Sequence, residues 1–102
     1  MGAFVKVAEV SQVPPGQAAM VEVQGRQIAL FNLDGNFYAI NNDCTHAGGS
    51  LSEGLIEGDQ VECPWHGARF NIKTGTKLRA PAPADVAAYK CRVTGTSVEI
   101  EL

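Results

Sequence analysis

Cys44-Thr45-His46 and Cys63-Pro64-Trp65-His66 are the two stretches around which the rest of the sequence is organised. Each of these two boxes offers one thiolate and one imidazole, and sixteen residues separate the first box from the second. The chain contains two histidines and three cysteines, so the boxes take up both histidines and all but one cysteine. Thiolates and imidazoles are common metal ligands. The pattern therefore predicts a metal centre held between two loops.

The bulk composition indicates one soluble domain. The chain has 102 residues, of which 45% are hydrophobic and 19% charged, which suits a single ordinary core. No apolar run approaches the roughly 20 residues of a transmembrane helix, and residues 1–6 lack the pattern of a signal peptide. Three cysteines, two of them beside histidines, do not form a disulfide framework, so we expect a reducing, cytoplasmic location. With a net charge of -3 and no basic patch, we expect neither nucleic acid nor a membrane as partner.

Alternating apolar and polar residues, punctuated by turn signals, predict short strands along the whole chain. Asp34-Gly35-Asn36 is a strong hairpin turn, and Gly25-Arg26 is a second expected hairpin tip. No stretch has a helical period with caps. The sequence therefore predicts an all-β fold, an antiparallel β sandwich or small barrel. The expected strands cover residues 4–10, 20–23, 27–33, 37–40, 61–63, 69–72, 86–93 and 97–102.

Residues 41–60 are expected to form an irregular loop. They contain four glycines and show no clean periodicity, and the first box lies among them. A structureless loop of that length is unusual in a small domain unless it is functional. Metal ligation would explain so long a loop in a small domain, because metal–ligand bonds would replace the missing hydrophobic contacts.

A single zinc ion is one possible occupant of the four ligands. Structural zinc sites usually pair cysteine with cysteine and histidine with histidine at short spacing, whereas each box here is mixed. Two adjacent metals, one taking the thiolates and the other the imidazoles, suit the mixed order better. A [2Fe–2S] cluster with two cysteines on one iron and two histidines on the other is such a site. Zinc remains the alternative at this point.

Two longer segments resemble the boxes of Rieske iron–sulfur proteins. They are Cys44-Thr45-His46-Ala47-Gly48-Gly49-Ser50-Leu51 and Cys63-Pro64-Trp65-His66-Gly67-Ala68-Arg69-Phe70. Length and strand pattern also resemble the standalone Rieske-type ferredoxins of bacterial ring-hydroxylating (aromatic) dioxygenase systems. The resemblance covers essentially the whole chain. It implies a single Rieske domain over residues 1–102, with a cluster-binding sub-domain of two loops at about 41–72 and a β sandwich or barrel base formed by the remainder.

The resemblance also implies the ligand set of one Rieske-type [2Fe-2S] cluster. Cys44 and Cys63 would hold the inner iron, while His46 and His66 would hold the outer, solvent-facing iron. An electron would leave through the histidine edge, and no residue would be catalytic. Because each iron-bound imidazole loses its second ring proton more easily when the iron is ferric, we expect the reduction potential to fall with pH in the alkaline range.

Four positions depart from the high-potential Rieske proteins of respiratory complexes. Gly49 and Trp65 stand where those proteins carry the cysteines of a disulfide between the loops. Ala68 and Phe70 stand where they carry hydroxyl groups that donate to the cluster region. Fewer donors stabilise the added charge less, so we expect a potential toward the low end of the Rieske range, near about -150 mV.

Other candidate residues have plainer interpretations. Cys91 lies between Tyr89 and Val93 on a predicted inward strand face, which favours a buried structural thiol over a ligand. Acidic residues between the boxes are either a solvated surface or a docking patch for a reductase; they are Glu53, Glu57 and Asp59.

The function that the resemblance implies is electron transport, in a dioxygenase component of aromatic hydrocarbon catabolism. A monomeric carrier would take electrons from an NAD(P)H-dependent flavoprotein reductase and deliver them to a terminal Rieske non-haem iron oxygenase. The chain has no nucleotide-binding Gly-rich fingerprint, and both histidines are committed, so it is expected to be neither the reductase nor the oxygenase. The alternatives are a small Rieske subunit of an NAD(P)H nitrite reductase and a zinc-stabilised binding module.

Overall fold

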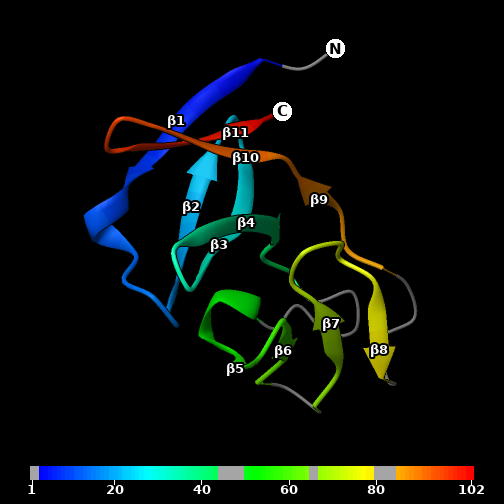
Figure 1. Ribbon diagram of the computed structural model, residues 1–102. Coiled ribbons are helices and arrows are strands. Elements are labelled where there is room, and N and C mark those ends of the chain that lie inside the picture. The colour runs from blue at the N-terminus through cyan, green and yellow to red at the C-terminus, as the bar shows by residue number, and fades with distance from the viewer. Residues whose placement is uncertain (1–2, 44–49, 65–66, 80–84) are drawn as a thin grey trace.

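A computed structural model describes residues 3–43, 50–64, 67–79 and 85–102 of the chain. Within these residues, the strands form three antiparallel sheets, which confirms the predicted all-β fold (Figure 1). We call them the terminal, central and site sheets. The terminal sheet pairs β1 (Phe4–Glu9), β11 (Ser97–Glu101) and β10 (Cys91–Thr94) in that order.

The other two sheets have four strands each. The central sheet has the order β2 (Ala18–Val23), β3 (Arg26–Leu33), β4 (Asn36–Asn41) and β9 (Ala88–Tyr89). The site sheet has the order β5 (Leu55–Glu57), β6 (Gln60–Glu62), β7 (Arg69–Asn71) and β8 (Lys77–Arg79). Two short 3-10 helices, η1 (Val10–Gln12) and η2 (Leu51–Glu53), complete the described elements.

The central sheet lies between two hydrophobic cores. On β3, Ala29 and Phe31 belong to a core shared with the site sheet, while Ile28 and Leu30 belong to a core shared with the terminal sheet. Successive side chains of a strand point to opposite faces, so this run is buried on both sides, which explains why it is continuously apolar. The three sheets therefore stack as layers, with both described ends of the chain near the terminal sheet and away from the site sheet (Figure 1).

Two tight turns fix the register of the central sheet. Asp34 and Gly35 have φ values of 55° and 93° and join β3 to β4, as predicted for a two-residue hairpin turn. The turn between β2 and β3 is formed by Gln24 and Gly25, with φ values of 51° and 79°. The expected tip at Gly25-Arg26 is therefore wrong by one residue, because Arg26 already pairs with Val23.

Two other expectations need correction. The segment 41–60 was expected to be irregular, yet it contains η2 and β5, and β5 pairs with β6. The strand expected over 86–93 is divided at Lys90, because β9 pairs with β4 whereas β10 pairs with β11. One stretch of chain thus passes from the central sheet to the terminal sheet.

The helices in the described residues are single 3-10 turns, and none is long and apolar enough to cross a membrane.

Candidate metal centre

The structure describes one of the four predicted ligands. Cys63 follows β6 directly and is 1% exposed. Cys44, His46 and His66 lie outside the described residues, as do Gly49 and Trp65. The described part of the site therefore consists of Cys63 and the residues that bound the two predicted loops.

The first loop begins and ends at neighbouring points of the backbone. Asp43 and Ser50 form an isolated antiparallel bridge, and the Leu51 N–H donates to the Asn42 carbonyl at 2.7 Å. The described backbone on the two sides of residues 44–49 is thus paired.

The side chain of Asn42 reinforces this base. It is 2% exposed, and its Oδ1 accepts from the Ser52 N–H at 2.9 Å while its Nδ2 donates to Ser50 Oγ at 3.2 Å. Its own N–H donates to the Gln27 carbonyl at 3.0 Å. One buried amide therefore ties the end of the first loop to the central sheet. Sequence reasoning missed it, because an asparagine after a strand is also an ordinary turn residue.

The second loop is closed in the same way. The Cys63 N–H donates to the Ala68 carbonyl at 2.7 Å, immediately before β7 begins at Arg69. Gly67, inside this loop, has a φ of 74°, a conformation that costs glycine little and strains other residues. The described residues on the two sides of 65–66 are therefore paired between β6 and β7.

Both loops leave from one buried core. Leu51, which follows the first box, lies in the same hydrophobic cluster as Cys63, Ala68 and Phe70. Leu51, Ala68 and Phe70 are all 0% exposed. The fold thus brings the residue that follows the first predicted loop together with residues on both sides of the second.

This arrangement fits an iron–sulfur cluster. A thiolate donor at the edge of an apolar core is suited to soft metal ions and to Fe–S clusters. Ala68 and Phe70 are fully buried beside Cys63 and carry no hydroxyl group. The two side chains therefore contribute no O–H donor to the surroundings of the Cys63 sulfur.

A close backbone contact also fixes the strand that leads to Cys63. A Cβ atom added to Gly54 would lie 2.3 Å from the Glu62 carbonyl oxygen and 2.8 Å from Val61 Cγ2. Neither separation is physically accessible, so only glycine allows the segment after η2 to pack against β6. Gly54 thereby supports the position of Glu62, just before the predicted ligand Cys63.

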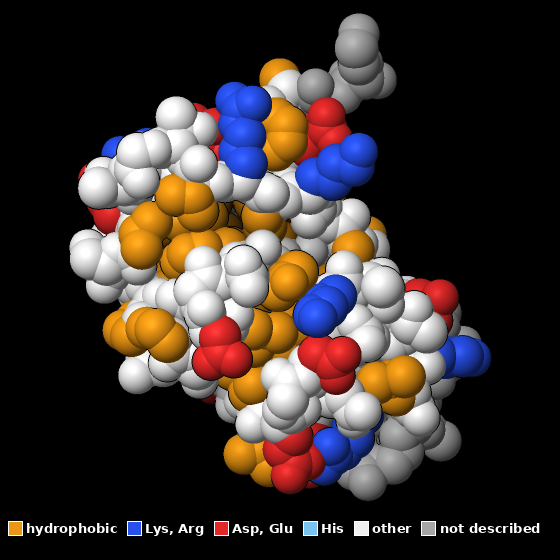
Figure 2. Space-filling model, viewed as in Figure 1, with side chains coloured by type: hydrophobic (Ala, Val, Ile, Leu, Met, Phe, Trp, Pro, Cys, Tyr) orange, Lys and Arg blue, Asp and Glu red, His pale blue; other side chains and the backbone are white. Residues whose placement is uncertain are grey.

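Arg69 carries the main ion-pair group of the described site sheet. Its guanidinium contacts Glu57 at 2.5 Å and Glu62 at 2.8 Å. The hydrogen bond to Glu57, followed by the attraction of both carboxylates, raises the pKa of Arg69 above its usual range despite its partial burial. Glu57, considered above as a solvated or docking residue, is thus half of an ion pair. In Figure 2 acidic and basic side chains lie beside one another over this sheet.

Cys91 lies outside the site. It belongs to β10 in the terminal sheet and packs partly buried against the core on that side. The thiol is only partly buried, because β10 lies at the edge of the terminal sheet. Burial nevertheless raises the pKa of the Cys91 thiol from 9.0 to about 12. The thiol therefore stays protonated at neutral pH, as expected for a structural cysteine.

Comparison with known proteins identifies the family. A model of the Rieske [2Fe-2S] domain matches residues 3–90. The 3-phenylpropionate/cinnamic acid dioxygenase ferredoxin subunit of Shigella boydii is 45% identical over 91% of this chain and 88% of its own length. The biphenyl dioxygenase ferredoxin subunit of a Pseudomonas strain is 40% identical over 96% of this chain and 91% of its own.

A solved structure agrees with these relatives. A chain in the complex of reduced oxygenase and oxidized ferredoxin in carbazole 1,9a-dioxygenase superposes with a TM-score of 0.89. It is 33% identical and covers 96% of this chain and 92% of its own. The layered fold, the two closed loops and these matches lead to one conclusion: the chain belongs to the Rieske [2Fe-2S] domain family.

Proposed function

We propose that this chain is a ferredoxin component that carries one electron at a time to a terminal Rieske non-haem iron oxygenase. The observation that carries the proposal is the coverage of its relatives, which match nearly end to end and are ferredoxin subunits of dioxygenase systems. Almost the whole chain is thus taken up by a Rieske domain. Its partner on the donor side would be an NAD(P)H-dependent flavoprotein reductase, and it would act as a monomer in the cytoplasm.

The proposed ligands are those of the two boxes. Cys44 and Cys63 would hold one iron of the [2Fe-2S] cluster, and His46 and His66 the other. Residues 41–72 would act as the cluster-binding sub-domain. When bound, such a cluster supplies a one-electron redox couple. The fold's own contribution is to close both loops at their bases and to bury the Cys63 thiolate away from water.

The residues around Cys63 favour a low reduction potential. Hydrogen bonds to the sulfurs of an Fe–S centre stabilise its reduced, more negative state. Ala68 and Phe70 are buried there without hydroxyl groups. We therefore expect a potential near the low end of the Rieske range, about -150 mV, which suits a carrier that receives electrons from a reduced flavin. A clearly positive potential in a redox titration would contradict this expectation.

Reconstitution tests the proposed function. The purified protein is mixed with the flavoprotein reductase and terminal oxygenase of a biphenyl dioxygenase system, NADH and biphenyl, and product formation is measured. We expect turnover only when all components are present, and none when Cys63→Ala replaces the wild-type chain. No turnover with an intact, reducible cluster, across the biphenyl, naphthalene and phenylpropionate systems, would overturn the assignment.

The second candidate is a Rieske subunit of an NAD(P)H nitrite reductase. Such a subunit should co-purify in a stoichiometric complex, whereas a carrier should elute alone from a sizing column at about 10.8 kDa. A zinc-stabilised binding module is the third. Zinc in place of iron and acid-labile sulfide in the purified protein would support it.

A further inference from the structure

Arg69 joins three strands of the site sheet through its guanidinium group. Nη2 contacts Oε1 of Glu57 on β5 at 2.5 Å and Oε1 of Glu62 on β6 at 2.8 Å. Nε donates to the same Glu62 oxygen at 3.1 Å, so one carboxylate oxygen contacts two nitrogens of the guanidinium. The Arg69 side chain is 21% exposed and that of Glu62 is 29% exposed, so the pair is partly shielded from water.

The Arg69–Glu62 pair lies at the base of the second ligand loop. Glu62 directly precedes Cys63, and Arg69 directly follows Ala68, whose carbonyl accepts the Cys63 N–H at 2.7 Å. Glu62 and Arg69 are also direct partners in the register of β6 and β7. Glu62 and Arg69 are therefore the last paired residues of β6 and β7 before Cys63 and the second predicted loop.

Three charged side chains form this group. One guanidinium faces two carboxylates, Glu57 and Glu62. Charges in partly shielded positions interact more strongly than fully solvated ones. A centre that gains an electron gains negative charge, so a nearby carboxylate disfavours reduction and a nearby guanidinium favours it.

We propose that Arg69 is a positioning residue that balances the charge of Glu62 beside Cys63 and thereby raises the reduction potential of the centre. The proposal rests on the proposed function, since it requires a redox cluster held by Cys63. It assigns Arg69 and Glu62 opposite effects. Removing the guanidinium lowers the potential, and removing the Glu62 carboxylate raises it.

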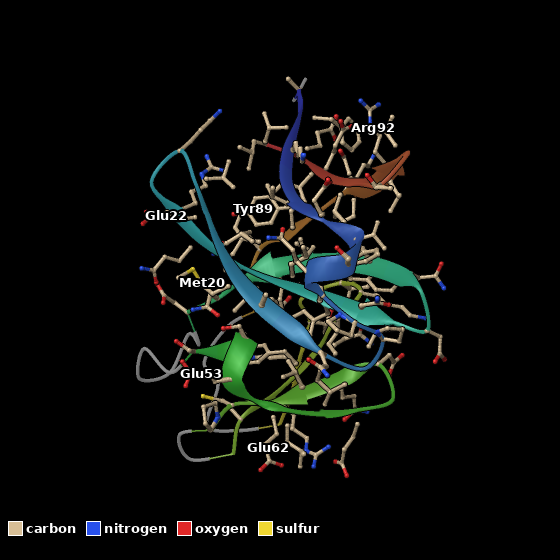
Figure 3. All side chains as sticks on the ribbon, turned by 90° about the vertical axis from the view of Figure 1, so that its left-hand side faces the viewer. Met20, Glu22, Glu53, Glu62, Tyr89 and Arg92 are labelled. Atoms are coloured by element: carbon tan, nitrogen blue, oxygen red, sulfur yellow. The ribbon has the colours of Figure 1, made fainter. Side chains whose placement is uncertain are left out.

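The chain contains a matched control. Arg92 on β10 and Glu99 on β11 form a direct cross-strand pair, with Nε of Arg92 2.6 Å from Oε1 of Glu99. This pair has the same chemistry as Arg69 and Glu62 but belongs to the terminal sheet. Figure 3 shows Arg92 and Glu62 at opposite ends of the molecule. Loss of the Arg92 charge tests the effect of net charge alone.

The experiment compares midpoint potentials of Arg69→Gln, Glu62→Gln and Arg92→Gln with the wild type by spectroelectrochemical titration at low salt. We expect a negative shift for Arg69→Gln, a positive shift for Glu62→Gln and no resolved shift for Arg92→Gln. Raising the salt to about 1 M, where the Debye length is about 3 Å, should reduce both shifts. Arg69→Lys should keep most of the wild-type potential, because it retains the positive charge.

Opposite signs separate a charge effect from a structural one. Both Arg69→Gln and Glu62→Gln break the same pair, so mere loosening of the loop would move the potential in one direction. Shifts of the same sign, no shift, or an equal shift in Arg92→Gln overturn the proposal. If Arg69→Gln does not fold, the shift in midpoint potential of Glu62→Gln decides: a positive shift supports the proposal, and a negative or absent shift overturns it. The EPR spectrum of the reduced wild type is recorded first, and a missing cluster there refutes the proposed function itself.

Discussion

The central sheet and the site sheet are stabilised in different ways. The strand β3 has eight residues, and its run from Ile28 to Phe31 is fully buried and serves two cores. Each described strand of the site sheet has three residues, and β6 and β7 bury one side chain each, Val61 and Phe70. The central sheet is thus built around a long strand that is buried on both faces, whereas the site sheet combines short strands, a core on one face and the ion pairs of Arg69.

This difference suggests a division of labour. A layer that is buried on both faces provides a rigid support, and the short-stranded layer next to it carries the loops of the metal centre. Because a bound group that contacts only the folded state stabilises it by mass action, the site sheet should depend on the cluster far more than the central sheet does. The predictions below test that dependence.

The largest expected effect follows from replacing the predicted ligand Cys63, which comes directly after β6. Cys63→Ala should abolish cluster binding, because a methyl group cannot coordinate iron. We expect faster hydrogen exchange over residues 50–79, with the backbone amides of β2, β3 and β4 still protected, measured by mass spectrometry. Cys91→Ala is the control and should keep the cluster and the wild-type exchange pattern. Uniform loss of protection in both sheets would refute the division.

Phe70→Ala tests the core beneath the loops. Phe70 is 0% exposed in the cluster that contains Cys63 and Leu51, and removal of a buried phenyl ring typically costs about 3–5 kcal/mol. We expect a loss of that size in the free energy of unfolding, measured in urea. Phe4→Ala, on the partly exposed end of β1, is the control. Equal losses for the two variants would contradict the account.

Two buried asparagines allow a sharper comparison. Asn42 ties the first ligand loop to the central sheet, whereas Asn32 donates to the Val13 carbonyl at 2.8 Å in the base. Both are 2% exposed. Replacing either by alanine leaves buried groups without a partner, which costs about 1–3 kcal/mol. Both variants should lose similar stability. Only Asn42→Ala should shorten the lifetime of the cluster, which is monitored by its visible absorbance. Equal lifetimes would show that Asn42 does not position the loop.

The smallest effect concerns Cys91 in the terminal sheet. Its thiol pKa is raised from 9.0 to about 12 by burial, so the folded state holds its proton at pH values where the unfolded chain has lost it. This contribution is fully present below about pH 9 and is lost as the pH rises toward about 12. The stability difference between wild type and Cys91→Ala should therefore be constant from pH 6 to 8 and fall above pH 9 in urea titrations. A constant difference up to pH 11 would contradict the shift.

The sequence could predict the regions where local signals are strong. Alternation and the Asp34-Gly35 turn predicted β3 and β4, because a two-residue turn with positive φ sets the register. The same rules missed β5 and η2, since a three-residue strand is too short to show a period. They also missed the change of sheet at Lys90, because one alternating pattern fits two different partners.

The candidate site shows the same limit. The pattern of cysteine and histidine predicts a ligand set, because metal chemistry restricts which residues can coordinate iron. It stays a prediction, since Cys44, His46 and His66 lie outside the described residues. The supports of the loops were not predicted. Asn42, Gly54 and Arg69 act through contacts with residues distant in sequence, such as the Gln27 carbonyl and Glu57. No local pattern distinguishes them from ordinary loop and surface residues.

Pulsed EPR spectroscopy of the dithionite-reduced protein, labelled with ¹⁵N at its two histidines, tests the central claim most directly. We expect a rhombic signal whose average g lies below that of all-cysteine ferredoxins, with strong coupling to the nitrogens of His46 and His66. The signal should disappear in Cys63→Ala. An average g typical of all-cysteine clusters, an absence of histidine nitrogen coupling, or stoichiometric zinc without an EPR signal would contradict it.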